Sequence, residues 1–241
     1  MESEAPEVAA WLRALYGVSE LPREGVLHVT SIAPSRQVIA IGPDAPTSEG
    51  DFFLLNLARA RADAILTTGS IVRLEATYQA SLQGPHAQAL QRYRVQVLGK
   101  GRVLCAIMTR DGRLPRLHPL WDDDTEKLVL TAPEHAEALE RELDGHATVL
   151  GVSDLDPRRA VQLLRERGAK LISIEAGPSA NAPLYESPSL VDELSLSIYE
   201  GPLVQLGGAL TPRLLEGMTM QSEVTREEQS GRWRYQRWLR A

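Results

Sequence analysis

Cysteine is almost absent from the sequence, because Cys105 is the only one among 241 residues. A single cysteine excludes a disulfide within the chain and any metal site built from several thiolates. Cys105 lies in the apolar run RVLCAIM, where a buried thiol packs as a small hydrophobic side chain. We therefore expect Cys105 to be buried and chemically inert.

Long apolar runs and blocks of like charge are also missing. No stretch approaches the roughly 20 apolar residues that cross a bilayer. The acidic start MESEAPEVAA differs from a secretory signal, which begins basic and continues apolar. The net charge of -6 is distributed along the chain, so no basic face for nucleic acid or for a membrane surface is indicated. These features favour a cytoplasmic protein that binds neither membranes nor nucleic acid.

Several catalytic motifs do not occur. The sequence has no Walker-type phosphate loop, no GxGxxG, no GxSxG and no HExxH pattern. Its five histidines, at positions 28, 86, 118, 135 and 146, never fall at metal-ligand spacing, which predicts surface or structural roles and no metal. The acidic run WDDDTE at 121–126 lacks a partner histidine, and we expect a solvated turn there.

Short apolar runs alternate with amphipathic ones, a pattern typical of α/β proteins. A helix is expected at 51–62, with Phe52, Leu55 and Ala58 or Arg59 on its apolar stripe. Asp156 as N-cap, Pro157 and Gly168 delimit a second helix. The strand, helix and strand around it predict parallel pairing of 148–152 with 171–175. Strands are expected at 25–32, 64–68, 103–108, 128–132, 148–152 and 171–175.

The C-terminal part changes character. Residues 192–202 alternate leucine and isoleucine with polar residues, and two further runs flank a polar turn that ends in Ser230 and Gly231. This alternation predicts half-buried antiparallel strands, with Trp233 and Tyr235 on one face and arginines on the other. The sheet should therefore be mixed.

The chain shows no internal repeat and no low-complexity linker. We expect residues 1–24 to be an N-terminal helical extension and residues 25–241 to form a single domain. Residues 78–93 are the longest segment whose pattern is ambiguous.

Candidate binding residues follow the expected strands, and the carboxyl ends of parallel strands are where open α/β sheets bind ligands. At 67–70 the small hydroxyl residues and the glycine of TTGS let the backbone approach a phosphate closely. Glu175 ends another strand, and Ser179 or Asn181 could cap a helix whose first amides suit a pyrophosphate. The alternative is a glycine turn without a ligand.

A third stretch, IMTRDGRLP, also leaves a strand. Thr109 and Arg110 stand ahead of an Asp-Gly turn, where the arginine could hold the additional phosphate of a phosphorylated dinucleotide. A solvated turn arginine is the alternative.

Five segments, taken in order, resemble the riboflavin-biosynthesis pyrimidine reductases of the dihydrofolate-reductase-like superfamily. They are DFFLLNLARARADAILTTGSIVRLEATY, VLCAIMTRDGRLP, LLRERGAKLISIEAGPSANAPL, LVDELSLSIYEGPLVQLGG and SGRWRYQRW, and the resemblance runs from about residue 26 to the C-terminus. It implies an α/β, three-layer fold with a mixed, mostly parallel sheet and a C-terminal antiparallel hairpin. It also implies a homodimer that uses NADPH to reduce 5-amino-6-(5-phosphoribosylamino)uracil, or a related heterocycle, by hydride transfer.

The resemblance assigns roles to individual residues. Thr47 and Asp51 match a threonine and an acidic residue that contact cofactor and substrate in the family. Arg59 matches an arginine near the end of the first long helix and is expected to bind the substrate, as is Glu175. Asp51 or Glu175 would relay the proton that accompanies the hydride.

The cofactor is expected against two segments. The family's turn beside the cofactor phosphates corresponds to residues 69–73, with Ile71 where threonine is usual, and the backbone from Gly177 to Ala180 would lie along the cofactor. With the residues of the third strand end included, the expected cofactor contacts are Thr47, Thr68, Gly69, Ser70, Val72, Arg73, Thr109, Arg110, Ala176, Gly177, Pro178, Ser179 and Ala180.

The chain departs from the family pattern at two places. The usual serine-leucine-aspartate-glycine segment is TSIAPSRQVIA here, and Ala176 replaces a glycine, where a Cβ would crowd the cofactor if the residue needed a positive φ. These departures motivate two alternatives, a non-catalytic NADPH- or nucleotide-binding protein of the same fold and an enzyme acting on a different heterocycle. No deaminase-like segment precedes residue 26, so we expect a reductase that stands alone.

Overall fold

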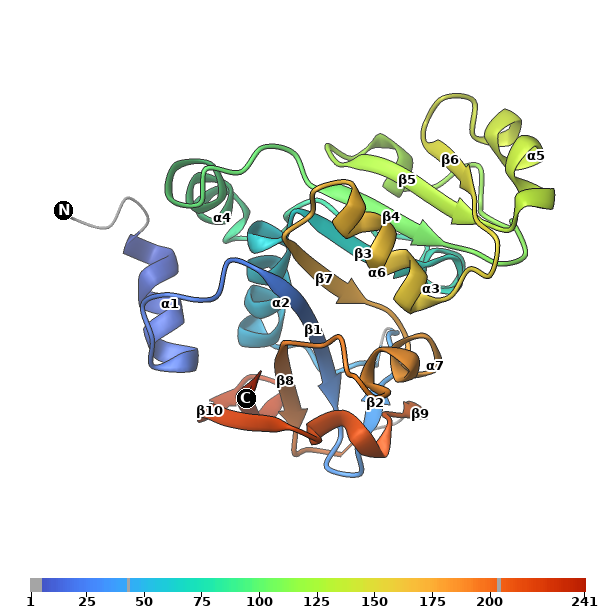
Figure 1. Ribbon diagram of the computed structural model, residues 1–241. Coiled ribbons are helices and arrows are strands. Elements are labelled where there is room, and N and C mark those ends of the chain that lie inside the picture. The colour runs from blue at the N-terminus through green and yellow to red at the C-terminus, as the bar shows by residue number, and fades with distance from the viewer. Residues whose placement is uncertain (1–5, 43, 203–204) are drawn as a thin grey trace.

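The computed structural model describes residues 6–42, 44–202 and 205–241, most of which belong to helices and strands around one mixed sheet (Figure 1). The α-helices are α1 (Pro6–Tyr16), α2 (Glu49–Arg61), α3 (Gly69–Leu74), α4 (Ala87–Arg92), α5 (Pro133–Leu143), α6 (Pro157–Glu166) and α7 (Pro178–Asn181). The strands are β1 (Gly25–Ile32), β2 (Gln37–Ile39), β3 (Ala64–Thr68), β4 (Leu104–Met108), β5 (Glu126–Thr131), β6 (Thr148–Gly151), β7 (Leu171–Glu175), β8 (Glu193–Tyr199), β9 (Leu206–Ala209), β10 (Met218–Glu228) and β11 (Gly231–Arg240). None of the described helices combines the length and apolar character needed to span a membrane.

The strands of the main sheet follow the order β10-β11-β8-β1-β7-β3-β4-β5-β6. All neighbours from β8 to β6 in this order are parallel. β11 pairs antiparallel with β8, and β10 pairs antiparallel with β11 and lies at the edge. The short strands β2 and β9 pair with each other, and β2 also pairs with β1. A mixed, mostly parallel sheet with a C-terminal antiparallel hairpin confirms the expected fold class.

One expected pairing is wrong, because β6 and β7 are not neighbours. β7 pairs with β1 and β3 near the middle of the sheet, whereas β6 pairs with β5 at the far edge. Every residue of β7 is buried, while both ends of β6 are exposed. A strand that is apolar on both faces gains most from a central position, which outweighs the short path between the two strands. The helix between them begins as expected, with the Asp156 carboxylate accepting a hydrogen bond from the Arg159 amide at 2.7 Å.

Helices cover both faces of the sheet. Ala160, Val161 and Leu164 of α6 pack in one cluster with Leu66 and Ile174. On the other face, α2, α3 and α5 supply apolar side chains to separate clusters. α5 and β6 lie at one end of the sheet and β10 at the other (Figure 1).

β8 is more buried than its alternating sequence indicates. Every residue from Glu193 to Tyr199 is buried, and the strand lies between β1 and β11, so the expectation of a half-buried strand is wrong. The polar residues of β8 face an internal layer, in which the hydroxyl groups of Ser195 and Tyr16 form a hydrogen bond. α1, which carries Tyr16, covers this face of the C-terminal strands and keeps it from solvent.

Glu193 is the centre of a buried ion cluster in this layer. Its carboxylate lies 2.6 Å from Nη2 of Arg61 in α2 and 2.7 Å from Nε of Arg237 in β11. Burial acts to raise the pKa of Glu193, but the two guanidinium groups outweigh it and hold the pKa below its usual value. Arg237 is thus buried on the side of β11 that carries Trp233 and Tyr235, and the expected separation of aromatic and arginine faces is wrong at this position.

The ambiguous segment 78–93 continues into α4 and then into a π-helical turn at Tyr93–Val97. Arg94 in this turn is buried, and its guanidinium donates hydrogen bonds to three main-chain carbonyl groups at the end of α2 and to the carbonyl of Gly101. The last carbonyl groups of a helix have no partner within the helix. Arg94 therefore caps α2 from outside.

The single cysteine has the surroundings expected from the sequence. Cys105 is buried on β4 and packs in an apolar cluster with Ile65, Ile107 and Val129. Burial raises the pKa of its thiol, which disfavours the reactive thiolate.

Candidate active site

A cavity of about 360 Å³ lies at the carboxyl ends of β1 and β7. Its wall consists of these strand ends, β2 and the residues that follow it, one face of α2 and the last turn of α3. No three histidine, cysteine, aspartate or glutamate side chains gather into a metal site anywhere in the described part of the chain. Six residues proposed from the sequence line the cavity, namely Asp51, Arg59, Glu175, Ala176, Gly177 and Pro178.

α2 presents one face, which carries two charged residues and a leucine, to the cavity. Asp51, Leu55 and Arg59 are spaced four residues apart, so they lie on one face of the helix and all three line the cavity. The expected apolar stripe is wrong at Phe52, which is 37% exposed, while the neighbouring Phe53 is buried in the core. The helix begins at Ser48, whose hydroxyl accepts a hydrogen bond from the Asp51 amide at 2.8 Å.

Arg59 and Glu175 form a bidentate ion pair on the cavity wall. Nε and Nη2 of Arg59 lie 2.8 and 2.7 Å from the two carboxylate oxygens, and the side chains are only 5% and 7% exposed. Tyr78 donates a hydrogen bond to the same carboxylate, and Nη1 of Arg59 donates to the carbonyl of Ser81. Burial acts to lower the pKa of Arg59, but Glu175 outweighs it and raises the pKa above its usual value. The two parallel hydrogen bonds therefore fix the relative geometry of the two side chains.

Asp51 is held differently from Glu175, because no cation lies against its carboxylate in the described structure. The hydroxyl of Ser31 in β1 donates a hydrogen bond to Oδ1 of Asp51 at 2.6 Å. Burial raises the pKa of Asp51, against the opposing effect of the hydrogen bond from Ser31. A carboxyl group in these surroundings retains a proton more readily than one in solvent and is suited to donate it.

Glu75 is a second carboxyl group of this kind, and the candidate residues chosen from the sequence do not include it. It follows α3 and lies four residues after Ile71, so both line the cavity from the same face of the helix. Burial and the nearby charge of Glu175 raise the pKa of Glu75 to about 7, although Arg59 acts in the opposite direction. The helical register of residues 69–74 is the signal that could have identified Glu75.

The backbone of residues 176–178, which follows β7, lines the cavity and is held in place by a hydrogen bond from the Asn181 side chain. Ala176 is absent from the described non-glycine residues that have a positive φ, so the expected conformational conflict at this position does not arise. Gly177 is the N-cap of α7, and Asn181 is the N-cap of the 3-10 turn Ala182–Tyr185, but its side chain makes no capping hydrogen bond. The Asn181 side chain instead donates a hydrogen bond to the Ala176 carbonyl at 2.6 Å and lies 2.8 Å from Nε2 of His28.

His28 is buried in β1 and completes this support. Its Nδ1 lies 2.6 Å from the Tyr185 hydroxyl, and burial lowers the pKa of the imidazole to about 4. The neutral ring therefore joins β1 to α7 and to the turn that follows it. This is the structural role that the sequence indicates for the histidines.

The turn between β3 and α3 is close-packed against the end of β4. A Cβ added to Gly69 would lie 2.9 Å from Cβ of Thr109, so only glycine fits there. Thr68 caps α3 and shares a hydrogen bond with Ser70. Arg73 reaches the neighbouring loop, where its Nη1 donates to the carbonyl of Arg113 at 2.6 Å.

The remaining candidate residues lie outside the cavity wall. The Val72 side chain is fully buried in the core, which leaves only its backbone for a ligand. Thr109 is buried and donates to Asp111, whereas the side chain of Arg110 is exposed. Thr47 accepts a hydrogen bond from Ser230 through its carbonyl. Ser179 and Ala180 belong to α7 and do not line the cavity.

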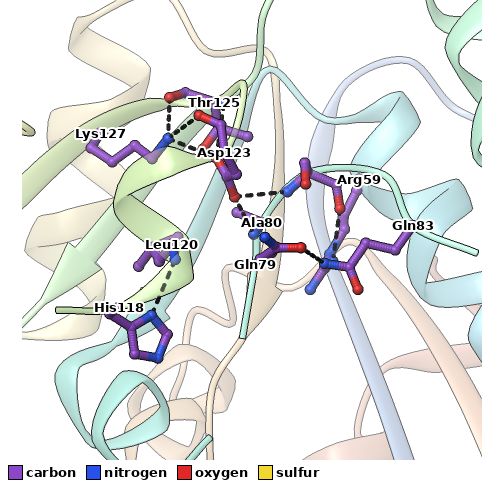
Figure 2. A network of polar contacts seen from close by, with 10 residues as sticks. Arg59, Gln79, Ala80, Gln83, His118, Leu120, Asp123, Thr125 and Lys127 are labelled. Atoms are coloured by element: carbon purple, nitrogen blue, oxygen red, sulfur yellow. Dashed lines mark hydrogen bonds and ion pairs between the residues drawn. The ribbon is translucent and has the colours of Figure 1, made fainter. Parts of the chain in front are cut away.

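The loop that carries Tyr78 and Ser81 also contains Ala80, which is hydrogen-bonded to Asp123 in the segment before β5 (Figure 2). Asp123 accepts hydrogen bonds from the amides of Ala80 and Ser81 at 2.7 and 3.1 Å. Its other oxygen pairs with Nζ of Lys127 at 2.6 Å, and both side chains are almost fully buried. The expectation of a solvated turn at 121–126 is therefore wrong at Asp123. Its carboxylate is buried because it accepts hydrogen bonds from the amides of the irregular loop at 80–81.

The family model described as the RibD C-terminal domain matches residues 40–237. No curated protein matches the sequence significantly. A pyrimidine reductase-like protein from Corynebacterium diphtheriae is similar in structure, with a TM-score of 0.73, 21% identity, and coverage of 95% of this chain and 98% of that one.

Two further solved structures are similar. The riboflavin biosynthesis reductase Rib7 from Saccharomyces cerevisiae has a TM-score of 0.60 and 14% identity, over 96% of this chain and 99% of that one. RibD from Acinetobacter baumannii has a TM-score of 0.66 and 15% identity, over 90% of this chain but only 58% of that one. The chain therefore spans a little over half of RibD. At these identities the similarity establishes the fold.

Proposed function

The chain belongs to the RibD C-terminal domain family, and from this we propose that it is an NADPH-dependent reductase of a pyrimidine- or pterin-like heterocycle. The observation that carries the proposal is the cavity at the carboxyl ends of β1 and β7, where Asp51, Glu75 and the Arg59–Glu175 pair surround a space of about 360 Å³. This is the edge of a parallel sheet at which ligands bind. Membership of the family alone would make 5-amino-6-(5-phosphoribosylamino)uracil the first substrate to test. A homodimer and a cytoplasmic location stay predictions.

The residues present fit a dinucleotide. No heavy atom lies within 4 Å of a Cβ built on Gly177, so the backbone there is open to a ligand. Ser70 and Arg73 follow β3, the strand next to β7, and the exposed Arg110 follows β4, the strand after that in the sheet. When bound, the cofactor supplies a hydride to a carbon of the substrate.

The side chains of the cavity would orient the substrate and supply the proton. Glu175, held in place by Arg59 and Tyr78, accepts hydrogen bonds from the substrate. Asp51 faces the same space with a raised pKa and donates the proton that balances the incoming hydride. The apolar side chains of the wall, such as Val29, Leu55 and Trp233, exclude water.

Calorimetric titration with NADPH and, in parallel, with NADH tests the cofactor assignment. We expect NADPH to bind about 10- to 100-fold more tightly, because hydrogen bonds to a charged group contribute about 1.5–3 kcal/mol. Arg110→Ala should remove most of this preference. Arg102→Ala is the matched control, since Arg102 is exposed just before the opposite end of β4. If neither nucleotide binds, the reductase proposal is wrong.

The ionisation of Glu75 should appear in the pH profile. A carboxyl group with a pKa of about 7 is mostly protonated at pH 6 and mostly ionised at pH 8. Hydride transfer adds electrons to the substrate, so an additional negative charge on the wall disfavours the reaction. We expect kcat/KM to fall about tenfold per pH unit above 7, and Glu75→Gln to remove this decrease. An unchanged profile in Glu75→Gln would exclude Glu75 as its source.

The non-catalytic alternative has lost one of its two supports. Ala176 needs no left-handed backbone, so its methyl group causes no conformational conflict in the nucleotide segment. The second support, the altered residues after β1, is unaffected. These residues form the turn that leads into β2, with Arg36 at φ 65°. Turnover of NADPH with any heterocycle would exclude the alternative.

A further inference from the structure

The charged groups on the cavity wall are unbalanced. Three carboxyl groups, those of Asp51, Glu75 and Glu175, line the cavity. Arg59 is the only cationic side chain among the described lining residues. The wall therefore holds more potential negative than positive charge.

Every nitrogen of the one cation already donates a hydrogen bond. Nε and Nη2 of Arg59 donate to the two oxygens of Glu175, and Nη1 donates to the Ser81 carbonyl at 3.2 Å. Its charge is balanced by a carboxylate in direct contact, and the Asp123 carboxylate fixes the loop that supplies the Ser81 carbonyl. A phosphate that took the Nε and Nη2 donors of Arg59 would break a buried ion pair and leave Glu175 without its partner, which is costly.

The rest of the wall offers a phosphate no substitute. The lining beyond the charged groups is mostly apolar, with Val38, Ile39 and Ile41 on the side of β2. Ile41 is 71% exposed although it lines the cavity, so even the solvent-facing part of this side is hydrophobic. Phosphate groups are usually held by arginine, lysine or clustered amides, and desolvation beside carboxylates opposes their binding.

We propose that the substrate of this cavity is an unphosphorylated pyrimidine- or pterin-like heterocycle, neutral or cationic, whose N–H groups donate to the carboxylates of the wall. The inference rests on the proposed reductase function and narrows its substrate class. The phosphates of the cofactor do not conflict with it, because they would lie outside the cavity, toward the β3–α3 turn and Arg110. A phosphoribosylated pyrimidine is then a poorer ligand than the same compound without its phosphate.

A matched pair of ligands tests the substrate class by binding, without reference to turnover. 5-Amino-6-ribosylaminouracil and its 5′-phosphate are titrated into the full chain in the presence of saturating NADP⁺, which cannot donate a hydride. We expect the unphosphorylated compound to bind at least about tenfold more tightly, which corresponds to about 1.4 kcal/mol. Equal or tighter binding of the phosphate would overturn the proposal, and so would the failure of both compounds to bind. The titration with NADPH alone decides the reductase proposal separately.

A pair of variants ties the preference to the cavity itself. Ile41→Arg adds a cation to the cavity wall and should reduce or reverse the preference for the unphosphorylated compound. Leu117→Arg adds the same charge at a residue that is 96% exposed and does not line the cavity, and it should leave the preference unchanged. An equal effect of both variants would assign the preference to the net charge of the protein and overturn the proposal.

Discussion

Replacement of Asp51 by asparagine is expected to lower kcat about 10²- to 10⁴-fold, the usual contribution of a positioned acid or base. Asp51 is half-buried, faces the cavity from α2 and accepts a hydrogen bond from Ser31. Its raised pKa suits it to donate a proton, whereas the carboxylate of Glu175 is already engaged by the guanidinium of Arg59. Asparagine has nearly the same shape and can still accept from Ser31, but it cannot release a proton.

Steady-state kinetics and calorimetric titration of Asp51→Asn with NADPH test this assignment together. The affinity for NADPH should stay within about twofold, because Asp51 lies on the side of the cavity away from the proposed phosphate contacts. Asp124→Asn is the matched control, since Asp124 is exposed in the turn before β5. Full activity of Asp51→Asn would remove Asp51 from the mechanism, and joint loss of binding and activity would indicate a structural role instead.

Replacement of Glu193 by alanine is expected to lower the free energy of unfolding by about 3–5 kcal/mol, the range for breaking a buried ion pair by removal of one partner. Glu193 balances Arg61 and Arg237, and all three side chains are buried. Without the carboxylate, two guanidinium groups remain in the protein interior with too few acceptors. The loss should be large because α1, α2 and β11 all meet at this cluster.

Urea denaturation followed by circular dichroism measures this loss. Glu200→Ala is the control, because Glu200 pairs with Arg232 and Arg234 at a partly exposed site where an ion pair contributes about 0–1 kcal/mol. Glu193→Gln should lie between the two variants, since glutamine keeps an acceptor but not the charge. Equal unfolding midpoints for Glu193→Ala and the wild-type protein would mean that the cluster does not stabilise the fold.

The fold was predictable where hydrophobic pattern and caps agree. The strands at β3, β4 and β7 are short apolar runs, and α6 has Asp156 and Gly168 at its ends, so local sequence was sufficient there. β8 could not be read in this way. Its serines and Glu193 imply a solvent-exposed face, but Ser195 and Glu193 are buried against Tyr16 and Arg237, which come from distant parts of the chain.

The same limit applies to the site. Arg59 and Glu175 were candidates from the family pattern, yet their direct pairing depends on β7 lying between β1 and β3. Glu75 carries no local signal of burial, because its raised pKa arises from packing and from Glu175, a hundred residues away along the chain. Asp123 looked solvated for a similar reason, since the amides that it binds belong to another loop.

The cap that Arg94 provides for α2 makes two segments depend on one another. Opening of the π-helical turn at Tyr93–Val97 would withdraw all the guanidinium hydrogen bonds from the last carbonyl groups of the helix that carries Asp51 and Arg59. Fraying at this end would release Arg59 from Glu175 first, because Arg59 stands in the last turn. A segment without any residue in the cavity thus sets the local unfolding free energy of the cavity wall.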